Sequence, residues 1–418
     1  MSLTETIHQM GRQARAAAHK LAQLSSDEKN AILRAMATEL RARTPELLAA
    51  NALDLEAGRA KGLSNAMLDR LKLDEGRVEA MASGIDQVAT LPDPVGQVME
   101  TWSRPNGIRI EQVRVPIGTI GIIYESRPNV TADAGVLCFK TGNATILRGG
   151  SEAIHSNQAI AAALQAGGER AGLPEHAVQL IPFTDRESVA VLAGMDKWLD
   201  LIIPRGGKGL IETVVSLARM PVIKHYDGIC HLYIDPQADI AMGVRLTVDS
   251  KTHKPGVCNA LETLLVHEAI APAFLPAVAE ALRAKGVELR GCEKTRAILP
   301  DVTPATEEDW STEYLDLILS IKVVGSQEEA VEHINEYGSH HSDCIVTADT
   351  EAAERFLRSV DSACVFHNAS TRFNDGGEFG FGAEIGISTD KLHARGPMGL
   401  RELTSYQYRI RGEGQTRG

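Results

Sequence analysis

The spacing of hydrophobic residues along the chain changes near residue 100. Up to about residue 90, Ala and Leu recur at helical spacing and the polar positions alternate in charge. This pattern predicts a helix-rich layer that packs on a later sheet, with an independent helical bundle as the alternative. Near residue 100, apolar and polar residues alternate on both sides of a turn at 105–107, which is typical of a β-hairpin.

From residue 117 onwards, short apolar runs alternate with helical patterns. Four buried strands are each followed by a helix between 117 and about 235, and the alternation returns between 229 and about 380. This alternation predicts parallel, doubly wound sheets, so we expect two α/β domains. The tail LRELTSYQYRIRGEG has the pattern of an edge strand, and with the hairpin it could form a small extra sheet that joins subunits.

Composition narrows the classes of function. The chain has 418 residues and a net charge of −12, which argues against a nucleic-acid partner because phosphate binding needs a basic surface. Six cysteines are scattered without metal-like spacing, so we expect reduced thiols and a cytoplasmic protein. We see no signal-peptide core and no apolar run of about 18 residues, so we expect no membrane partner.

Cys258 is the candidate nucleophile. It follows a Pro-Gly turn and precedes the apolar run LETLLVH, and turn residues disfavour regular structure, which would present the side chain. Lys251, His253 and Lys254 add positive charge nearby in sequence, and positive charge favours the reactive thiolate. The alternative is a small buried apolar residue, as most free cysteines are.

Three strand ends are candidate ligand sites. The strand LDLIIPR runs into a Gly-rich turn at 205–209 and then a helix, an arrangement that can bind a phosphate, although it lacks the GxGxxG spacing. Arg148 ends a second strand and could hold the 2′-phosphate of NADPH. Arg127 and Asn129 follow a third strand, and Asn129 could donate to an oxyanion. Each site has an alternative interpretation. The turn at 205–209 could be a plain strand–helix turn, Arg148 a surface arginine, and the segment with Arg127 and Asn129 an ordinary turn.

The histidines form a further set without metal-like spacing. His225, His253, His340 and His341 fit neither HExxH nor a Cys/His zinc pattern, so we expect no metal. They either contact anionic groups of a substrate or lie on the surface.

Taken in order, the strings IGIIYESRPN, TGN, TILRGGSE, IIPRGGKG and PGVCNALE resemble the aldehyde dehydrogenase superfamily. Within it, strings such as YESRPNVTADAG, IKHYDGICHLYID, KTHKPGVCNALE and NASTRFNDGGEFGFGAEIGISTDKLHARGPMGL are similar to the γ-glutamyl phosphate reductase branch, over about residues 114 to 410. The resemblance implies an aldehyde-dehydrogenase-like α/β fold. It has a dinucleotide-binding domain (1–98 and 118–228), a catalytic domain (229–396) and a small β oligomerisation element (99–117 and 397–418). A homo-oligomer, a dimer or larger, is expected.

The resemblance also implies roles for individual residues. Cys258 would be the nucleophile and Asn129 the oxyanion donor. For the substrate α-carboxylate, Arg127 and Arg372 are the candidates because a planar guanidinium suits a carboxylate. His225 is a further substrate-binding candidate. The residues expected to bind NADPH or NADP⁺ are Arg148, Ser151, Glu152, Arg205, Gly206, Gly207, Lys208 and Glu313, the last of them at the nicotinamide ribose.

One departure from the superfamily pattern bears on the reaction. Hydrolytic members carry ELGG before the cysteine, whereas this chain reads KHYDG, with His225 near the place of the water-activating glutamate. Loss of that base would protect a thioester from water. The resemblance therefore implies NADPH-dependent reduction of L-glutamyl 5-phosphate to L-glutamate 5-semialdehyde in proline biosynthesis, with glutamate 5-kinase as a possible partner. The alternatives are a hydrolytic NAD(P)-dependent aldehyde dehydrogenase and a non-enzymatic nucleotide-binding protein.

Overall fold

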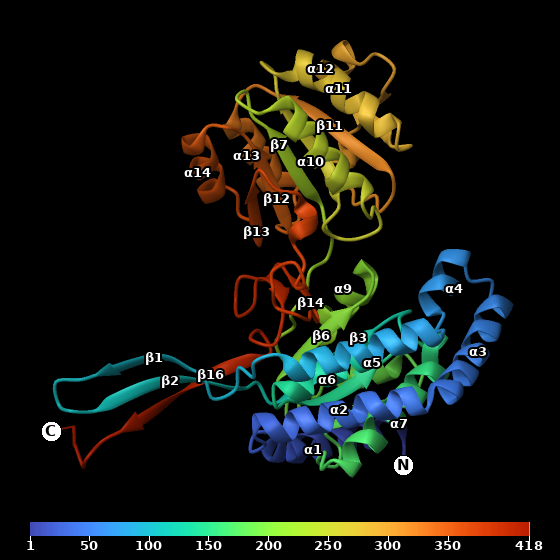
Figure 1. The fold of residues 1–418 in the computed structure, drawn as a ribbon, viewed down its shortest axis with the longest axis vertical. Helices are drawn as coiled ribbons and strands as arrows, with labels where there is room; N and C mark the ends of the chain where they lie inside the picture. Colours follow the sequence, from blue (N-terminus) through green and yellow to red (C-terminus); the bar gives the residue numbers. More distant parts are fainter. Residues whose placement is uncertain (418) are drawn as a thin grey trace. The chain divides into compact units, whose positions relative to one another are not determined.

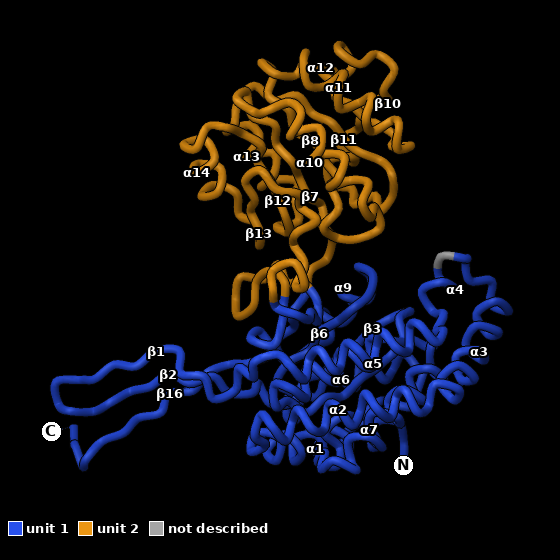
Figure 2. The backbone as a smooth tube through the Cα atoms, viewed as in Figure 1, with its two compact units in different colours: residues 1–224, 381–386, 398–418 blue, residues 225–380, 387–397 orange. Residues whose placement is uncertain are grey.

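The computed structural model describes residues 1–417, apart from the side chain of Ala66. Its contacts divide the chain into two compact units (Figure 2). Unit 1 comprises residues 1–224, 381–386 and 398–418, and unit 2 comprises residues 225–380 and 387–397. No helix among the described residues is long and apolar enough to cross a membrane.

Unit 1 begins with the predicted helical layer (Figure 1). The helices are α1 (Leu3–Leu21), α2 (Ser26–Ala42), α3 (Thr44–Ala60), α4 (Asn65–Leu71) and α5 (Glu75–Thr90). Ser2 and Ser25 start α1 and α2 with capping boxes, in which the serine hydroxyl and a glutamate three residues later satisfy exposed N–H groups. α1 contacts strand β4, and α2 packs against α5 and α7, so the layer covers a sheet as expected.

The sheet of unit 1 is parallel, which confirms the parallel arrangement predicted for the four strands between residues 117 and about 235. Its strands are β3 (Thr119–Tyr124), β4 (Ala144–Arg148), β5 (Val178–Leu180) and β6 (Leu201–Arg205), in the order β5-β4-β3-β6. The connecting helices are α6 (Asn129–Lys140), η1 (Ser151–Ala153), α7 (Ile154–Arg170), α8 (Glu187–Ala193) and α9 (Lys208–Leu217). The strand order reverses between β3 and β6, and ligands of such sheets bind beyond the carboxyl ends of the strands at this point.

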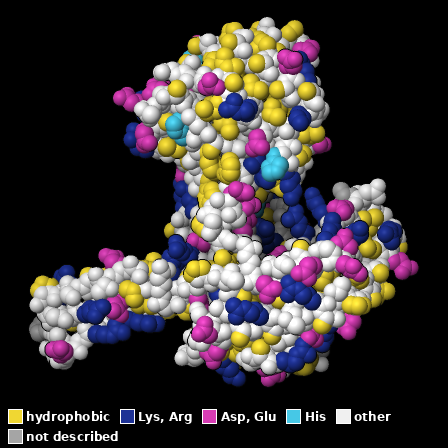
Figure 3. Space-filling view, viewed as in Figure 1, with side chains coloured by type: hydrophobic (Ala, Val, Ile, Leu, Met, Phe, Trp, Pro, Cys, Tyr) yellow, Lys and Arg dark blue, Asp and Glu magenta, His cyan; other side chains and the backbone are white. Residues whose placement is uncertain are grey.

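A three-stranded antiparallel sheet completes unit 1. It pairs β1 (Val98–Ser103), β2 (Arg109–Pro116) and β16 (Thr404–Arg411), so the predicted hairpin and tail strand do form one small sheet. Tyr406, Tyr408 and Ile410 on β16 are at least half exposed, and hydrophobic and basic side chains are both visible on this sheet (Figure 3).

Unit 2 contains a seven-stranded parallel sheet in the order β10-β9-β11-β8-β7-β12-β13. The strands are β7 (Cys230–Ile234), β8 (Leu261–His267), β9 (Glu288–Gly291), β10 (Thr303–Pro304), β11 (Ile318–Val324), β12 (Ser342–Val346) and β13 (Cys364–His367). The helices are α10 (Ile240–Thr252), α11 (Ala271–Arg283), α12 (Glu293–Ile298), η2 (Glu308–Ser311), α13 (Gln327–Tyr337), α14 (Thr350–Ser359) and η3 (Thr371–Phe373). Two short strands, β14 (Gly386–Ser388) and β15 (Gly396–Met398), pair with each other.

Two hydrophobic cores hold this sheet. One lies under α10 and α11 and contains Phe274 and Leu282, and the other lies under α13 and α14 and contains Ile334 and Phe356. The predicted strands β7, β8, β11, β12 and β13 are all present. α10 was not predicted, and it runs to Thr252, so the stretch at 251–260 is irregular only from His253 onwards.

Candidate active site

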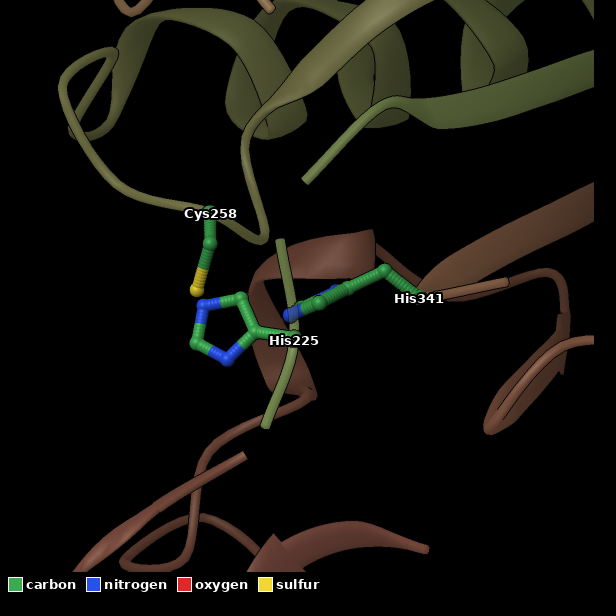
Figure 4. A group of neighbouring side chains, drawn as sticks. All are labelled: His225, Cys258 and His341. Carbon is green, nitrogen blue, oxygen red and sulfur yellow. The ribbon is translucent and has the colours of Figure 1, made fainter. Parts of the chain in front are cut away.

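Three chemically active side chains meet at the amino-terminal edge of the unit 2 sheet. His225 precedes β7, Cys258 precedes β8 and His341 directly precedes β12, and these strands are neighbours in the order β8-β7-β12. One nitrogen or sulfur atom of each lies within 4.8 Å of the other two. We call these residues the Cys–His–His group, and Figure 4 shows the Cys258 sulfur directed at the His225 ring.

The backbone of Cys258 lies unusually close to the backbone of Gly228. A β-carbon on Gly228 would lie 1.9 Å from the carbonyl oxygen of Cys258, so only glycine allows the two loops to meet. The thiol of Cys230 donates to the same carbonyl at 3.2 Å. The N–H of Gly228 donates to Glu313 Oε1 at 2.9 Å, so the carboxylate expected at the nicotinamide ribose also supports this loop. Cys258 itself is partly exposed.

The surroundings of His225 define which ring nitrogen can act as a base. Its Nδ1 lies 2.9 Å from the carbonyl oxygen of Ile387. A carbonyl can only accept, so Nδ1 carries the hydrogen and Nε2 of the neutral ring is an acceptor. Figure 4 shows Nε2 as the ring nitrogen next to the Cys258 sulfur. His225 is therefore placed to accept the proton of the thiol.

His341 was expected among the histidines that contact a substrate or lie on the surface, but it was not assigned to the site. Its side chain is fully buried, its Nδ1 lies 2.8 Å from Ser342 Oγ, and its Nε2 has no hydrogen-bond partner. Burial, together with repulsion from His225, holds the pKa of His341 well below its usual range, so the ring is neutral near pH 7. The available signal was its place directly before a predicted strand.

Lys251, which was expected to add positive charge near the thiol, is paired with a buried carboxylate. Lys251 Nζ lies 2.6 Å from Glu262 Oε2, and both side chains are fully buried, so its charge is already paired. Burial raises the pKa of Glu262 to about 7 and lowers that of Lys251, which reflects the cost of keeping both ions out of water. His253 and Lys254 are exposed.

Arg372 lies in η3, which is tied to the residue after Cys258. Asn259 Nδ2 donates to the carbonyl oxygens of Arg372 and Asn374, and Thr371 Oγ1 donates to the carbonyl of Asn259. The Arg372 Nε is buried and has no hydrogen-bond partner.

The candidate nucleotide-binding residues, apart from Glu313, lie in unit 1. The glycine-rich turn joins β6 to the N-terminus of α9, next to β3 and hence at the reversal of strand order. The N–H of Gly207 donates to Glu125 Oε2 at 3.2 Å, while a β-carbon on Gly207 would meet nothing within 4 Å. Lys208 is exposed at the start of α9.

The other unit 1 candidates have internal contacts. Arg148 is 7% exposed, and its guanidinium lies 3.0 Å from the Thr184 carbonyl oxygen and 3.3 Å from Ser188 Oγ. A phosphate would have to compete with these contacts. Glu152 Oε1 accepts the N–H and hydroxyl of Ser126, whereas Ser151 is exposed.

Arg127 and Asn129 lie beyond the carboxyl end of β3. Arg127 is exposed. Asn129 opens α6, and its amide donates to Asp133 Oδ2 at 2.8 Å, which leaves one further amide hydrogen for another acceptor.

Comparison with known proteins places the chain among well-defined relatives. The sequence model of the aldehyde dehydrogenase family matches residues 2–295. A γ-glutamyl phosphate reductase of Moorella thermoacetica is 57% identical and the match covers 100% of both chains. One of Rhodospirillum rubrum is 56% identical, over 98% of this chain and 96% of the relative. The crystal structure of γ-glutamyl phosphate reductase from Thermotoga maritima matches with a TM-score of 0.97 at 48% identity, over 98% of this chain and 99% of that one.

Proposed function

The chain belongs to the aldehyde dehydrogenase family, and we propose that it reduces L-glutamyl 5-phosphate to L-glutamate 5-semialdehyde and phosphate, with NADPH as reductant, in proline biosynthesis. Family membership implies a nicotinamide cofactor, and the choice of NADPH is part of the proposal. The observation that carries the proposal is the Cys–His–His group, which pairs a partly exposed cysteine with imidazole side chains and contains no carboxylate.

The residues present fit a nicotinamide nucleotide. The turn before α9 lies at the reversal of strand order, and the space around Gly207 is open, so a pyrophosphate could reach this helix N-terminus if it displaced the Glu125 carboxylate from the Gly207 N–H. When bound, the cofactor would supply a hydride to the acyl carbon. The residues proposed to hold it are Arg148, Ser151, Glu152, Arg205, Gly206, Gly207, Lys208 and Glu313.

The first chemical step uses the pair formed by Cys258 and His225. The S–H bond breaks as Nε2 of His225 takes the proton, and the thiolate forms a C–S bond to the acyl carbon. The C–O bond to phosphate then breaks, and the phosphate leaves with the proton that His225 received. The product is a thioester on Cys258, and Asn129 is proposed to donate to the oxyanion that forms on the way.

The absence of a carboxylate from the Cys–His–His group matters after the thioester has formed. Hydride reduction and attack by water compete for the same acyl carbon. Hydrolytic members of the family use a glutamate to activate that water, and the group has no such carboxylate; its His225 lies beside the sulfur. This arrangement favours phosphate over water as the acceptor in the reverse direction.

The substrate α-carboxylate is proposed to bind Arg372, with Arg127 as a second candidate. The unpartnered Nε of Arg372 and its connection to Asn259 support the first choice. The three-stranded sheet β1-β2-β16 is proposed to pair subunits of a homo-oligomer through its exposed edges. A separate glutamate 5-kinase would supply the acyl phosphate.

Phosphate dependence of the reverse reaction tests the proposal. The enzyme is mixed with glutamate 5-semialdehyde and NADP⁺, with and without inorganic phosphate, and nicotinamide absorbance is followed. We expect reduction of NADP⁺ only with phosphate, and none with the Cys258→Ser variant. Equal reduction without phosphate would mean that water accepts the acyl group, and the hydrolytic alternative would replace this proposal.

A further inference from the structure

The side chains around the nucleophile are also ligands that a soft divalent cation prefers. Thiolate sulfur and imidazole nitrogen are the commonest protein ligands of Zn²⁺, and three protein ligands with an open fourth position are typical of reactive zinc sites. We propose that Cys258, His225 and His341 form an inhibitory binding site for Zn²⁺, with Sγ and the two Nε2 atoms as ligands. Bound Zn²⁺ would block the nucleophile Cys258 reversibly.

The spacing of the group suits such an ion after a small contraction. Zn–N bonds of ~2.0–2.1 Å and a Zn–S bond of ~2.3 Å place tetrahedral ligand atoms roughly 3.3–3.6 Å apart. The three atoms lie within 4.8 Å of one another, so shifts of about 1 Å complete the geometry. Cys258 sits on a loop between α10 and β8 and is partly exposed, so its side chain is the one that can move.

The outer contacts of both histidines match those of metal ligands. A ligating imidazole usually engages its other nitrogen with a carbonyl or another polar group, which orients the ring. His225 does this through Nδ1 and the Ile387 carbonyl, and His341 does it through Nδ1 and Ser342 Oγ. In addition, the Nε2 of His341 is buried without a hydrogen-bond partner, which is costly unless another group satisfies it. A cation in the group would do so.

The functional consequence follows from the ligand set. A cation bound to Sγ occupies the lone pair that attacks the acyl carbon, so acyl transfer stops until the ion leaves. Binding of Zn²⁺ to the thiol and its two imidazole neighbours requires neither the substrate nor the nucleotide assigned under the proposed function. Its test can therefore fail or succeed independently of that assignment.

A spectroscopic titration tests the site directly. Co²⁺ is added to the reduced full-length protein without substrate or nucleotide, and Zn²⁺ is then added in competition. We expect a near-ultraviolet sulfur-to-cobalt band that Zn²⁺ abolishes and that the Cys258→Ser variant lacks. His341→Asn keeps a polar group near Ser342 but removes Nε2, and we expect it to weaken Co²⁺ binding at least ~10-fold.

His340→Asn is the matched control. His340 is adjacent, its Nδ1 lies 2.6 Å from the Asp361 carbonyl oxygen, and it is outside the group. Its backbone φ of 58° is a value that asparagine tolerates. We expect this variant to bind Co²⁺ as the unmodified protein does. Equal weakening by the two substitutions, or an unchanged affinity in His341→Asn, would overturn the proposal.

A second measurement covers the case in which His341→Asn does not fold. Iodoacetamide alkylation of Cys258 in the unmodified protein is followed by mass spectrometry, with Zn²⁺ and after its removal by EDTA. We expect at least ~10-fold protection by Zn²⁺ that EDTA reverses, and loss of this protection in His225→Asn. Alkylation at the same rate with and without Zn²⁺ would refute the site.

Discussion

Gly228 faces the carbonyl oxygen of Cys258 so closely that a β-carbon at residue 228 would lie 1.9 Å from it. Gly228→Ala must therefore push the two loops apart and move the nucleophile. We expect kcat to fall by about 10²-fold, because a 1 Å misplacement of reacting groups has an effect of that size, and the free energy of unfolding to fall by roughly 1–3 kcal/mol. Steady-state kinetics and urea unfolding measure the two effects.

Gly325→Ala serves as the control for this prediction. A β-carbon there would meet its nearest atom, Glu329 Oε2, at an ordinary contact distance of 3.4 Å. We expect near-normal activity and stability from this variant. Normal turnover in Gly228→Ala would show that the close approach has no influence on the reaction.

Removal of the imidazole of His225 should slow the reaction at the thiol. Loss of a general base typically costs 10²–10⁴-fold, so we expect His225→Ala to reduce kcat by about that factor. Alkylation of Cys258 should also shift to higher pH, and added imidazole should restore part of the rate. His19→Asn, at an exposed position on α1, is the control. An unchanged pH profile of alkylation in His225→Ala would remove His225 from the mechanism.

Arg372 should determine the affinity for the substrate carboxylate. Its buried Nε lacks an acceptor, so the guanidinium has a donor available for an anion. We expect Arg372→Ala to raise KM by at least ~10-fold with a smaller effect on kcat, because it removes a charge-assisted bidentate contact. Arg372→Lys keeps the charge but loses the fork, so its KM should be intermediate. Arg358, which is exposed on α14, provides a control substitution to Ala, and an unchanged KM in Arg372→Ala would contradict the role.

His333 should make the protein less stable in mild acid. Burial, together with His231 and Lys322, lowers the pKa of His333 to about 2, and Lys322 Nζ lies 3.1 Å from its Nδ1. The folded ring therefore stays neutral, while the unfolded ring takes up a proton below its usual pKa of about 6.5. The stability that the neutral ring contributes is present above that pH and is lost as pH falls.

With an unfolded pKa of about 6.5, protonation of the unfolded ring lowers the free energy of unfolding at pH 5.5 by about 1.4 kcal/mol relative to high pH. We expect the drop in the free energy of unfolding between pH 7.5 and 5.5 to be smaller by about that amount in His333→Gln than in the unmodified protein. Urea unfolding at both pH values measures the difference between the two proteins. Equal drops in both would show that His333 does not bind its proton differently in the two states.

Local sequence patterns predicted the strands and Cys258 but not the full composition of the site. The apolar runs of β7, β8 and β12 and the Pro-Gly turn before Cys258 are signals within a few residues. His341 joins the group only because β7 separates β8 from β12 in the sheet, and that order depends on how the helices pack, which no local pattern encodes.

Lys251 shows how an unpredicted helix changes the surroundings of a charged side chain. Its distance from Cys258 along the chain suggested an electrostatic role, but α10 continues to Thr252 and places the lysine on a buried face opposite Glu262. Because the direction of a side chain is fixed by the helix that carries it, the unpredicted helix α10 determined the partner of this charge.

The Cys–His–His group comes from the segments before three separate strands, which has a consequence for biosynthesis. During translation, His225 is synthesised first, Cys258 follows, and His341 is added only after most of unit 2 has been made. Until β12 docks beside β7, the thiol has one of its two imidazole neighbours and the sheet has an open edge. The nascent chain therefore cannot complete this group of side chains before β12 has paired with β7, so the reactive centre forms together with the sheet.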